Sequence, residues 1–77
     1  MSAASYNICI CKGILKYNSR LREDSLLLFE RAKEYVNRPE PFFYQAVILN
    51  EEYVKESMDT DGFVKILELI EQGLRAG

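Results

Sequence analysis

The sequence contains no histidine and no tryptophan, and its 77 residues include only two cysteines, two prolines and four glycines. Histidine is the commonest general base and a frequent metal ligand, so its absence excludes Ser-His-Asp and Cys-His catalytic sets within one chain. No pair of carboxylates stands in an apolar segment that would suggest acid–base catalysis. The sequence therefore predicts a protein that is not an enzyme and that carries no cofactor.

The two cysteines cannot build the disulfide framework of a small secreted domain. On a strand, Cys9 and Cys11 would point to the same face, where thiolates from a second copy could complete a metal site. The plainer interpretation is a pair of small apolar side chains, which is how free cysteine usually behaves. We therefore predict no metal ion at these residues.

Hydrophobic residues make up 48% of the chain, as is typical of one globular domain. We assign that domain to residues 6–77, after a short frayed segment 1–5. A domain this small buries a limited fraction of its surface, so we expect a homodimer or a protein partner. No apolar stretch approaches the ~20 residues that span a membrane, and the first seven residues lack the Lys or Arg of a signal peptide. We expect an intracellular, soluble protein, cytoplasmic or nuclear, without membrane contact.

Charge is divided unevenly along the chain. The residues before Pro39 carry seven basic and four acidic side chains, and the residues from Pro39 onward carry three basic and eight acidic ones. Such a chain can pair with itself or with a charged partner. Its net charge of −2 gives no global attraction to nucleic acid.

The first half of the chain reads as a strand followed by a helix. Residues 6–17 alternate apolar and polar side chains and are rich in β-branched residues, which favours a strand. Residues 20–37 repeat apolar residues at seven-residue spacing through Leu21, Leu28 and Tyr35, which favours a helix. Ala32 and Val36 widen this apolar face. No internal repeat is apparent.

The second half reads as two strands and a helix. Residues 42–49 are apolar on both alternating faces, which fits a buried strand or, alternatively, a short buried helix. A turn at 50–52 would lead into an edge strand over 53–57. Residues 62–75 give the clearest helix. Its apolar face consists of Phe63, Ile66, Leu67, Ile70 and Leu74.

These elements predict a single small α+β domain of order β-α-β-β-α, with two helices packed on a short antiparallel or mixed sheet. If residues 42–57 form a helix instead, the chain is an all-α bundle of three or four helices.

Aromatic side chains supply the leading functional prediction. Tyrosine is favoured at interfaces because it buries a rigid area while it keeps a polar tip. We predict a non-enzymatic protein-interaction module, either a subunit or a regulator, that binds a larger partner or itself. The residues expected to contact the partner are Phe42, Phe43, Tyr44, Tyr53 and Lys55.

A basic segment supplies an alternative. Lys12, Lys16, Arg20 and Arg22 could contact phosphates, with Tyr17 nearby as a stacking surface. The chain has no Gly-rich phosphate loop. This alternative is a regulator that associates with nucleic acid.

Residues 57–68 resemble the loop of an EF-hand calcium site, which places Asp59, Asp61 and Glu68 at ligand positions. Ser57 stands where the first Asp belongs, and Lys65 brings a cation near the ion. The competing interpretation, which we adopt, is an acidic start to an amphipathic helix.

Two family resemblances bear on function. The order of elements over most of residues 12–75 resembles the smallest subunit of the transcription and repair factor TFIIH. The resemblance runs from residues 12–15 through 43–47 to a last helix with residues 63–65, and it implies docking onto a larger subunit through a sheet edge. The pattern from Lys33 to Tyr53 is similar to the paired amphipathic helix domains of transcriptional corepressors. That second resemblance implies a helix over 42–57 and a groove that binds partner helices.

Overall fold

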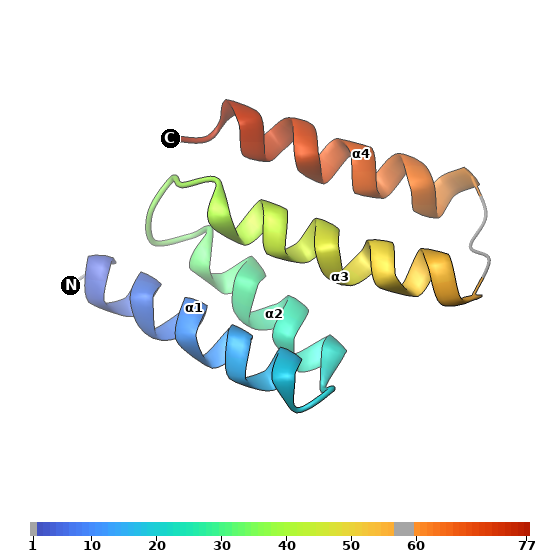
Figure 1. The fold of residues 1–77 in the computed structure, drawn as a ribbon. Coiled ribbons are helices and arrows are strands. Elements are labelled where there is room, and N and C mark those ends of the chain that lie inside the picture. Colours follow the sequence, from blue (N-terminus) through green and yellow to red (C-terminus); the bar gives the residue numbers. More distant parts are fainter. Residues whose placement is uncertain (1, 57–59) are drawn as a thin grey trace.

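The computed structural model describes residues 2–56 and 60–77, and over these residues it contains helices and no strand. The helices are α1 (Ser2–Asn18), α2 (Arg22–Ala32), α3 (Glu40–Glu56) and α4 (Thr60–Arg75). They lie in a row in chain order, with α1 and α4 at its opposite ends (Figure 1). The molecule is flat, with principal extents of 40 × 29 × 12 Å.

The predicted α+β fold is wrong, because every predicted strand that lies in the described residues is helical. Residues 6–17 belong to α1, while residues 42–49 and the described part of 53–57 belong to α3. Residues 2–5, expected to be frayed, are also part of α1. The sheet implied by the resemblance to the TFIIH subunit is absent from the described residues, because these predicted strands are helical. The four helices match the alternative all-α prediction.

The α1 prediction failed because short apolar alternation does not separate strand from helix. In α1, Tyr6, Cys9 and Gly13 are buried and share one helical face, whereas Ile8 is 53% exposed. Strand propensity reflects packing on a pleated surface, so tertiary contacts along a helical face can override it.

The first helical hairpin consists of α1 and α2 and closes around a glycine. A Cβ added at Gly13 would lie 2.7 Å from Cε1 of Phe29, so only glycine admits the ring. Ser25 Oγ donates a buried hydrogen bond of 2.8 Å to the Gly13 carbonyl oxygen. Tyr6, Cys9 and Ala32 complete this core.

The second hairpin consists of α3 and α4 and also closes around a glycine that lies against a phenylalanine ring. Here the glycine is on the second helix of the hairpin and the phenylalanine on the first. A Cβ added at Gly73 of α4 would lie 2.5 Å from Cε1 of Phe43 of α3. Ala46, Ile66 and Leu69 form the buried core of this hairpin. Pro39 precedes α3, and the first-turn amide of Phe42 donates to the Pro39 carbonyl at 3.1 Å.

The two hairpins have similar dimensions and correspond at several buried positions. Helices α1 and α3 each contain 17 residues, and α3 begins 38 residues after α1, as α4 does after α2. The buried Phe29 and Ala32 of α2 correspond to the buried Ile66 and Leu69 of α4, 37 residues on.

Both predicted helices exist, and their buried faces match the prediction only in part, since Ala32 and Ile66 are buried as predicted. Helix α2 ends at Ala32 rather than 37, and its buried residues are Ser25, Phe29 and Ala32, while Leu21 is exposed. Helix α4 buries Ile66, Leu69 and Gly73. The rest of its predicted apolar face points outward. These exposed residues are Phe63, Leu67, Ile70 and Leu74.

None of the helices in the described part of the chain is long and apolar enough to cross a membrane.

Candidate functional site: a groove between α1 and α3

The hairpins meet where α2 packs against α3. The ring of Phe29 stacks on that of Tyr44, with centroids 4.8 Å apart and an interplanar angle of 17°. Gln45 Nε2 donates to the Leu26 carbonyl at 3.2 Å and to Glu30 Oε1 at 3.0 Å. This contact fixes α3 beside α2 and so sets the distance between α1 and α3.

The hydrogen bond from Gln45, followed by that from Lys33, lowers the pKa of Glu30 below its ordinary value, because both bonds favour the charged carboxylate. Lys33 also lies 4.3 Å from the ring centroid of Phe42. The other amide atom of Gln45, Oε1, is buried without a hydrogen-bond partner in the described residues. The hairpin junction is thus partly polar.

An apolar pocket of about 350 Å³ opens between α1 and α3, and Phe29 of α2 contributes to its lining. Tyr44 and Val47 of α3 line it and are 37% and 53% exposed, respectively. The pocket is lined by Ile14, Tyr17, Asn18, Phe29, Tyr44, Val47 and Ile48. It exposes enough apolar surface to receive a side chain of a ligand.

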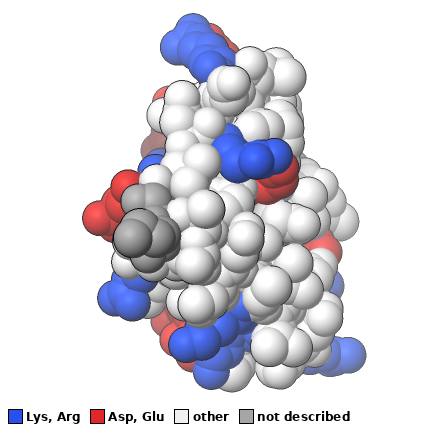
Figure 2. All heavy atoms as spheres, turned by 90° about the vertical axis from the view of Figure 1, so that its left-hand side faces the viewer, with Lys and Arg blue, Asp and Glu red and all other residues white. Residues whose placement is uncertain are grey.

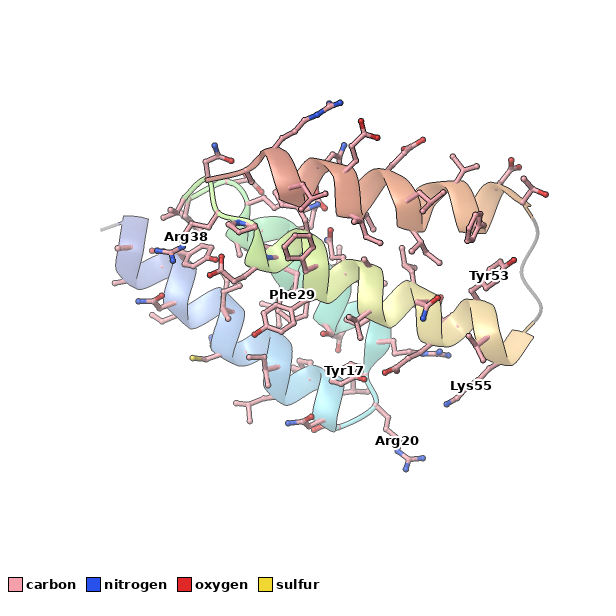
Figure 3. The ribbon with its side chains drawn as sticks, turned by 45° about the horizontal axis from the view of Figure 1, so that its top comes forward. Tyr17, Arg20, Phe29, Arg38, Tyr53 and Lys55 are labelled. Atoms are coloured by element: carbon pink, nitrogen blue, oxygen red, sulfur yellow. The ribbon has the colours of Figure 1, made fainter. Side chains whose placement is uncertain are left out.

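A second pocket, of about 450 Å³, adjoins the first, because Tyr17 and Asn18 line both. Its remaining residues include three cations, Arg20, Arg22 and Lys55. Tyr17, Arg20 and Lys55 lie toward one end of the molecule, and Arg38 toward the other (Figure 3). We call the two pockets together the α1–α3 groove.

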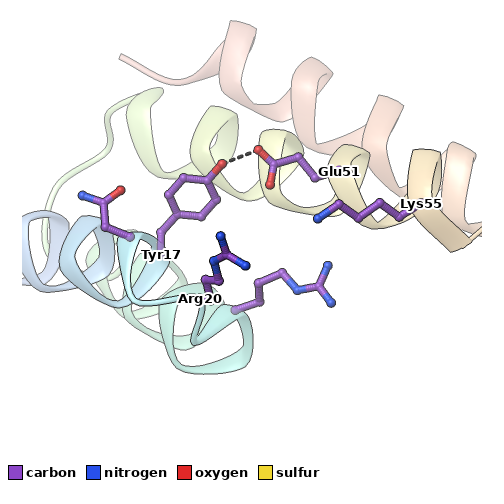
Figure 4. Close-up of a pocket in the computed structure, with 6 residues that line it drawn as sticks. Tyr17, Arg20, Glu51 and Lys55 are labelled. Carbon is purple, nitrogen blue, oxygen red and sulfur yellow. Dashed lines mark hydrogen bonds between the residues drawn. The ribbon is translucent and has the colours of Figure 1, made fainter.

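Tyr17 joins the two helices that border the groove. Its Oη donates a short hydrogen bond to Glu51 Oε1 of α3 (Figure 4). This bond to a carboxylate is the main cause that raises the pKa of Tyr17 above its ordinary value. Because Glu51 is engaged by Tyr17, its negative charge is directed toward the phenol.

The turn between α1 and α2 holds Arg20 in a left-handed conformation, with φ of 63°. This conformation costs a residue with a Cβ about 1 to 2 kcal/mol and favours glycine or asparagine. The Arg20 amide donates to the Tyr17 carbonyl at 2.9 Å. The turn thereby places a cation at the groove at some cost to stability.

The predicted partner-binding residues are divided between the groove and the interior. Tyr44 and Lys55 line the groove. Phe42 packs on the core of the second hairpin, and Phe43 covers Gly73. Tyr53 lies 5.7 Å from the ring of Phe63.

The predicted basic segment does not form one patch. Arg20 and Arg22 line the groove, whereas Lys16 lines a separate hollow with Asp24, Glu30 and Glu34. Lys12 is exposed. Figure 2, which faces the side of the molecule where the two chain termini lie, shows Lys and Arg at several positions, some of them beside Asp or Glu.

The residues considered for metal binding do not come together. Asp61 and Glu68 lie on α4, which begins at Thr60, so residues 60–68 are helical rather than a calcium loop. Asp59 lies outside the described residues. Cys9 is buried and Cys11 exposed, so their thiols do not share a face. Within residues 2–56 and 60–77, no group of three or more acidic or cysteine side chains could hold a metal ion.

The architecture is that of stacked helical hairpins, the arrangement from which α-solenoid proteins are built. Neither protein-family models, nor curated proteins, nor solved structures show a match to this chain.

Proposed function

We propose that this chain is a non-enzymatic protein-interaction module whose α1–α3 groove binds an extended, acidic peptide segment of a partner. The proposal depends on one observation, namely that an apolar pocket and a pocket with three cations adjoin at Tyr17 and Asn18. A ligand that places an aliphatic side chain in the first and a carboxylate in the second would use both.

The apolar pocket would supply the anchor. Covering Tyr44 and Val47 removes apolar surface from water, at about 25 cal/mol per Å². Because Phe29 forms the pocket and is only 1% exposed, the pocket is preformed by the hairpin junction. A preformed pocket reduces the ordering cost of binding.

The cationic pocket would supply charge selectivity. Arg22 pairs with Glu52 at 3.4 Å, and both side chains are partly exposed. Exposed ion pairs contribute about 0 to 1 kcal/mol, so a ligand carboxylate can compete for the Arg22 guanidinium. Arg20 and Lys55 add two further cations at the same pocket.

Nucleic acid fits this groove less well than an acidic peptide. Glu51 and Glu52 lie among the cations of this pocket, so its positive charge is local rather than continuous. A phosphate backbone needs a continuous basic track, and Lys16 belongs to another hollow.

The test is fluorescence anisotropy with a labelled peptide of Asp and Glu residues around a single Leu. We expect Lys55→Glu to weaken binding about tenfold and Val47→Ser about threefold. Lys12→Glu makes the same charge change away from the groove and should leave the affinity unchanged. Equal weakening by Lys55→Glu and Lys12→Glu, or tighter binding of a single-stranded oligonucleotide than of the peptide, would contradict the proposal.

A further inference from the structure

The outward face of α4 is a helix-packing surface without a helix on it in the described part of the chain. Phe63, Leu67, Ile70 and Leu74 repeat at spacings of four, three and four and are all exposed, Leu74 by 75%. One side of the Phe63 ring also lies 5.7 Å from the ring of Tyr53 on α3, so this residue borders the face. This spacing gives the narrow apolar seam by which one helix packs along another. We call these four residues the α4 stripe.

In the first hairpin, the face of α2 that corresponds to the α4 stripe packs against the next helix, α3. With the 37-residue offset that relates the cores of α2 and α4, the residues of α2 that meet α3 correspond to the α4 stripe. Leu26, Glu30 and Lys33 contact Gln45 and Phe42 of α3. Their counterparts on α4 are Phe63, Leu67 and Ile70. The α4 stripe therefore occupies the position that, in α2, receives the first helix of the following hairpin.

The opposite end of the row carries a matching surface on α1. Ala4, Ile8, Cys11 and Leu15 have the same spacing of four, three and four and are all exposed, Leu15 by 64%. We call these residues the α1 stripe. Because α1 and α4 lie at opposite ends of the row, one chain cannot bring its own two stripes together (Figure 1).

We propose that copies of this chain associate head to tail, with the α4 stripe of one copy packed on the α1 stripe of the next. In each such contact, α1 of one copy lies beside α4 of the other, just as α3 lies beside α2 within a single chain. The association therefore extends the row of hairpins through a contact of the same kind as the α2–α3 contact within the chain.

Chemistry favours this pairing over the association of two like ends. The internal junction uses polar groups, with Glu30 accepting from Gln45, whereas both outer stripes are apolar and lack such groups. Helix α1 carries only basic charges, Lys12 and Lys16, while α4 carries more acidic than basic residues. Pairing α4 with α1 joins opposite charges around an apolar centre, whereas pairing α4 with α4 joins like charges.

The experiment is sedimentation velocity on the whole chain and on two variants, each of which blocks one stripe. Ile8→Glu places a charge in the α1 stripe and Leu67→Glu places one in the α4 stripe. Both positions are about half exposed in the single chain, so we expect folding to persist, as circular dichroism would verify. The parent chain should associate as its concentration rises toward about 1 mM, and each variant alone should associate at least about tenfold more weakly.

The decisive sample is an equal mixture of the two variants. The Ile8→Glu variant keeps its α4 stripe intact, and the Leu67→Glu variant keeps its α1 stripe intact. If the contact is head to tail, these two stripes pair, and the mixture should form a dimer of about twice the monomer mass. If Ile8→Glu alone associates as well as the parent, the interface joins like ends and the proposal is wrong. A parent chain that stays monomeric, or a mixture that does not associate, also overturns it. Neither result bears on the groove, which the peptide titration tests separately.

Discussion

The Phe29 ring lies directly over Gly13, where an added Cβ would come within 2.7 Å of the ring edge. Phe29 cannot move away, because it is only 1% exposed and stacks on Tyr44 from the second hairpin. One glycine in α1 thus sets the approach of α2 and, through the stacked rings, the position of α3.

We therefore expect Gly13→Ala to lower the free energy of unfolding by about 1 to 3 kcal/mol, since overpacking outweighs the better helix propensity of alanine. Urea denaturation measures this change. Asn7→Ala, an exposed change on the same helix, should stay within about 0.5 kcal/mol of the parent. A Gly13→Ala variant as stable as the parent would show that the two helices are further apart than described.

Arg20→Gly should act in the opposite direction on stability. Glycine relieves the left-handed conformation at φ of 63°, so we expect the free energy of unfolding to rise by up to about 1 kcal/mol. Arg31→Gly in the helical part of α2 should lower it by about 1 kcal/mol. If Arg20→Gly also leaves binding of the acidic peptide unchanged, Arg20 is not part of the binding surface.

Glu30 should make the free energy of unfolding depend on pH in the acidic range. Because the hydrogen bonds from Gln45 and Lys33 lower its pKa in the folded state, its contribution is present above the unfolded pKa of about 4.3. That contribution disappears as the pH falls through the folded pKa. Glu30→Gln should therefore lose less stability than the parent between pH 7 and pH 3, as measured by urea denaturation. Glu34→Gln, the matched control, should follow the parent.

Tyr17 should ionise at a higher pH while Glu51 is present, because the hydrogen bond to the carboxylate favours the protonated phenol. Its stabilising contribution is present below the unfolded pKa of about 10 and is lost as the pH rises through the folded pKa. Glu51→Ala should lower the pKa of Tyr17, which NMR titration of the tyrosine ring carbons detects. Glu52→Ala should leave that pKa where it is, and an equal change in both variants would contradict the assignment.

Sequence patterns predicted the two helices that carry a long amphipathic repeat, α2 and α4, but only part of each buried face, namely Ala32 and Ile66. The reason is visible at Ser25 and Gly73, which are small or polar and yet buried between helices. In α4 the larger apolar residues Leu67 and Leu74 point outward instead. Sequence patterns predict the buried face of a helix from its large apolar residues, whereas the buried helix contacts here use glycine and serine.

The groove was only partly accessible to sequence reasoning. Tyr44, Lys55, Arg20 and Arg22 were all singled out, but as members of two separate predicted surfaces. Their meeting depends on the junction of α2 with α3, which joins residues far apart in the chain. Val47 carried no signal, because an apolar residue in an apolar run is indistinguishable from core.

The most direct test of the proposed function is to map the acidic peptide on the chain by ¹H–¹⁵N NMR titration. We predict that amide signals of Asn18, Val47 and Lys55 shift together and saturate at one peptide concentration, while those of Leu67 and Ile70 stay in place at low protein concentration. Shifts confined to the α4 stripe, or no saturable shift in the groove, would contradict the account.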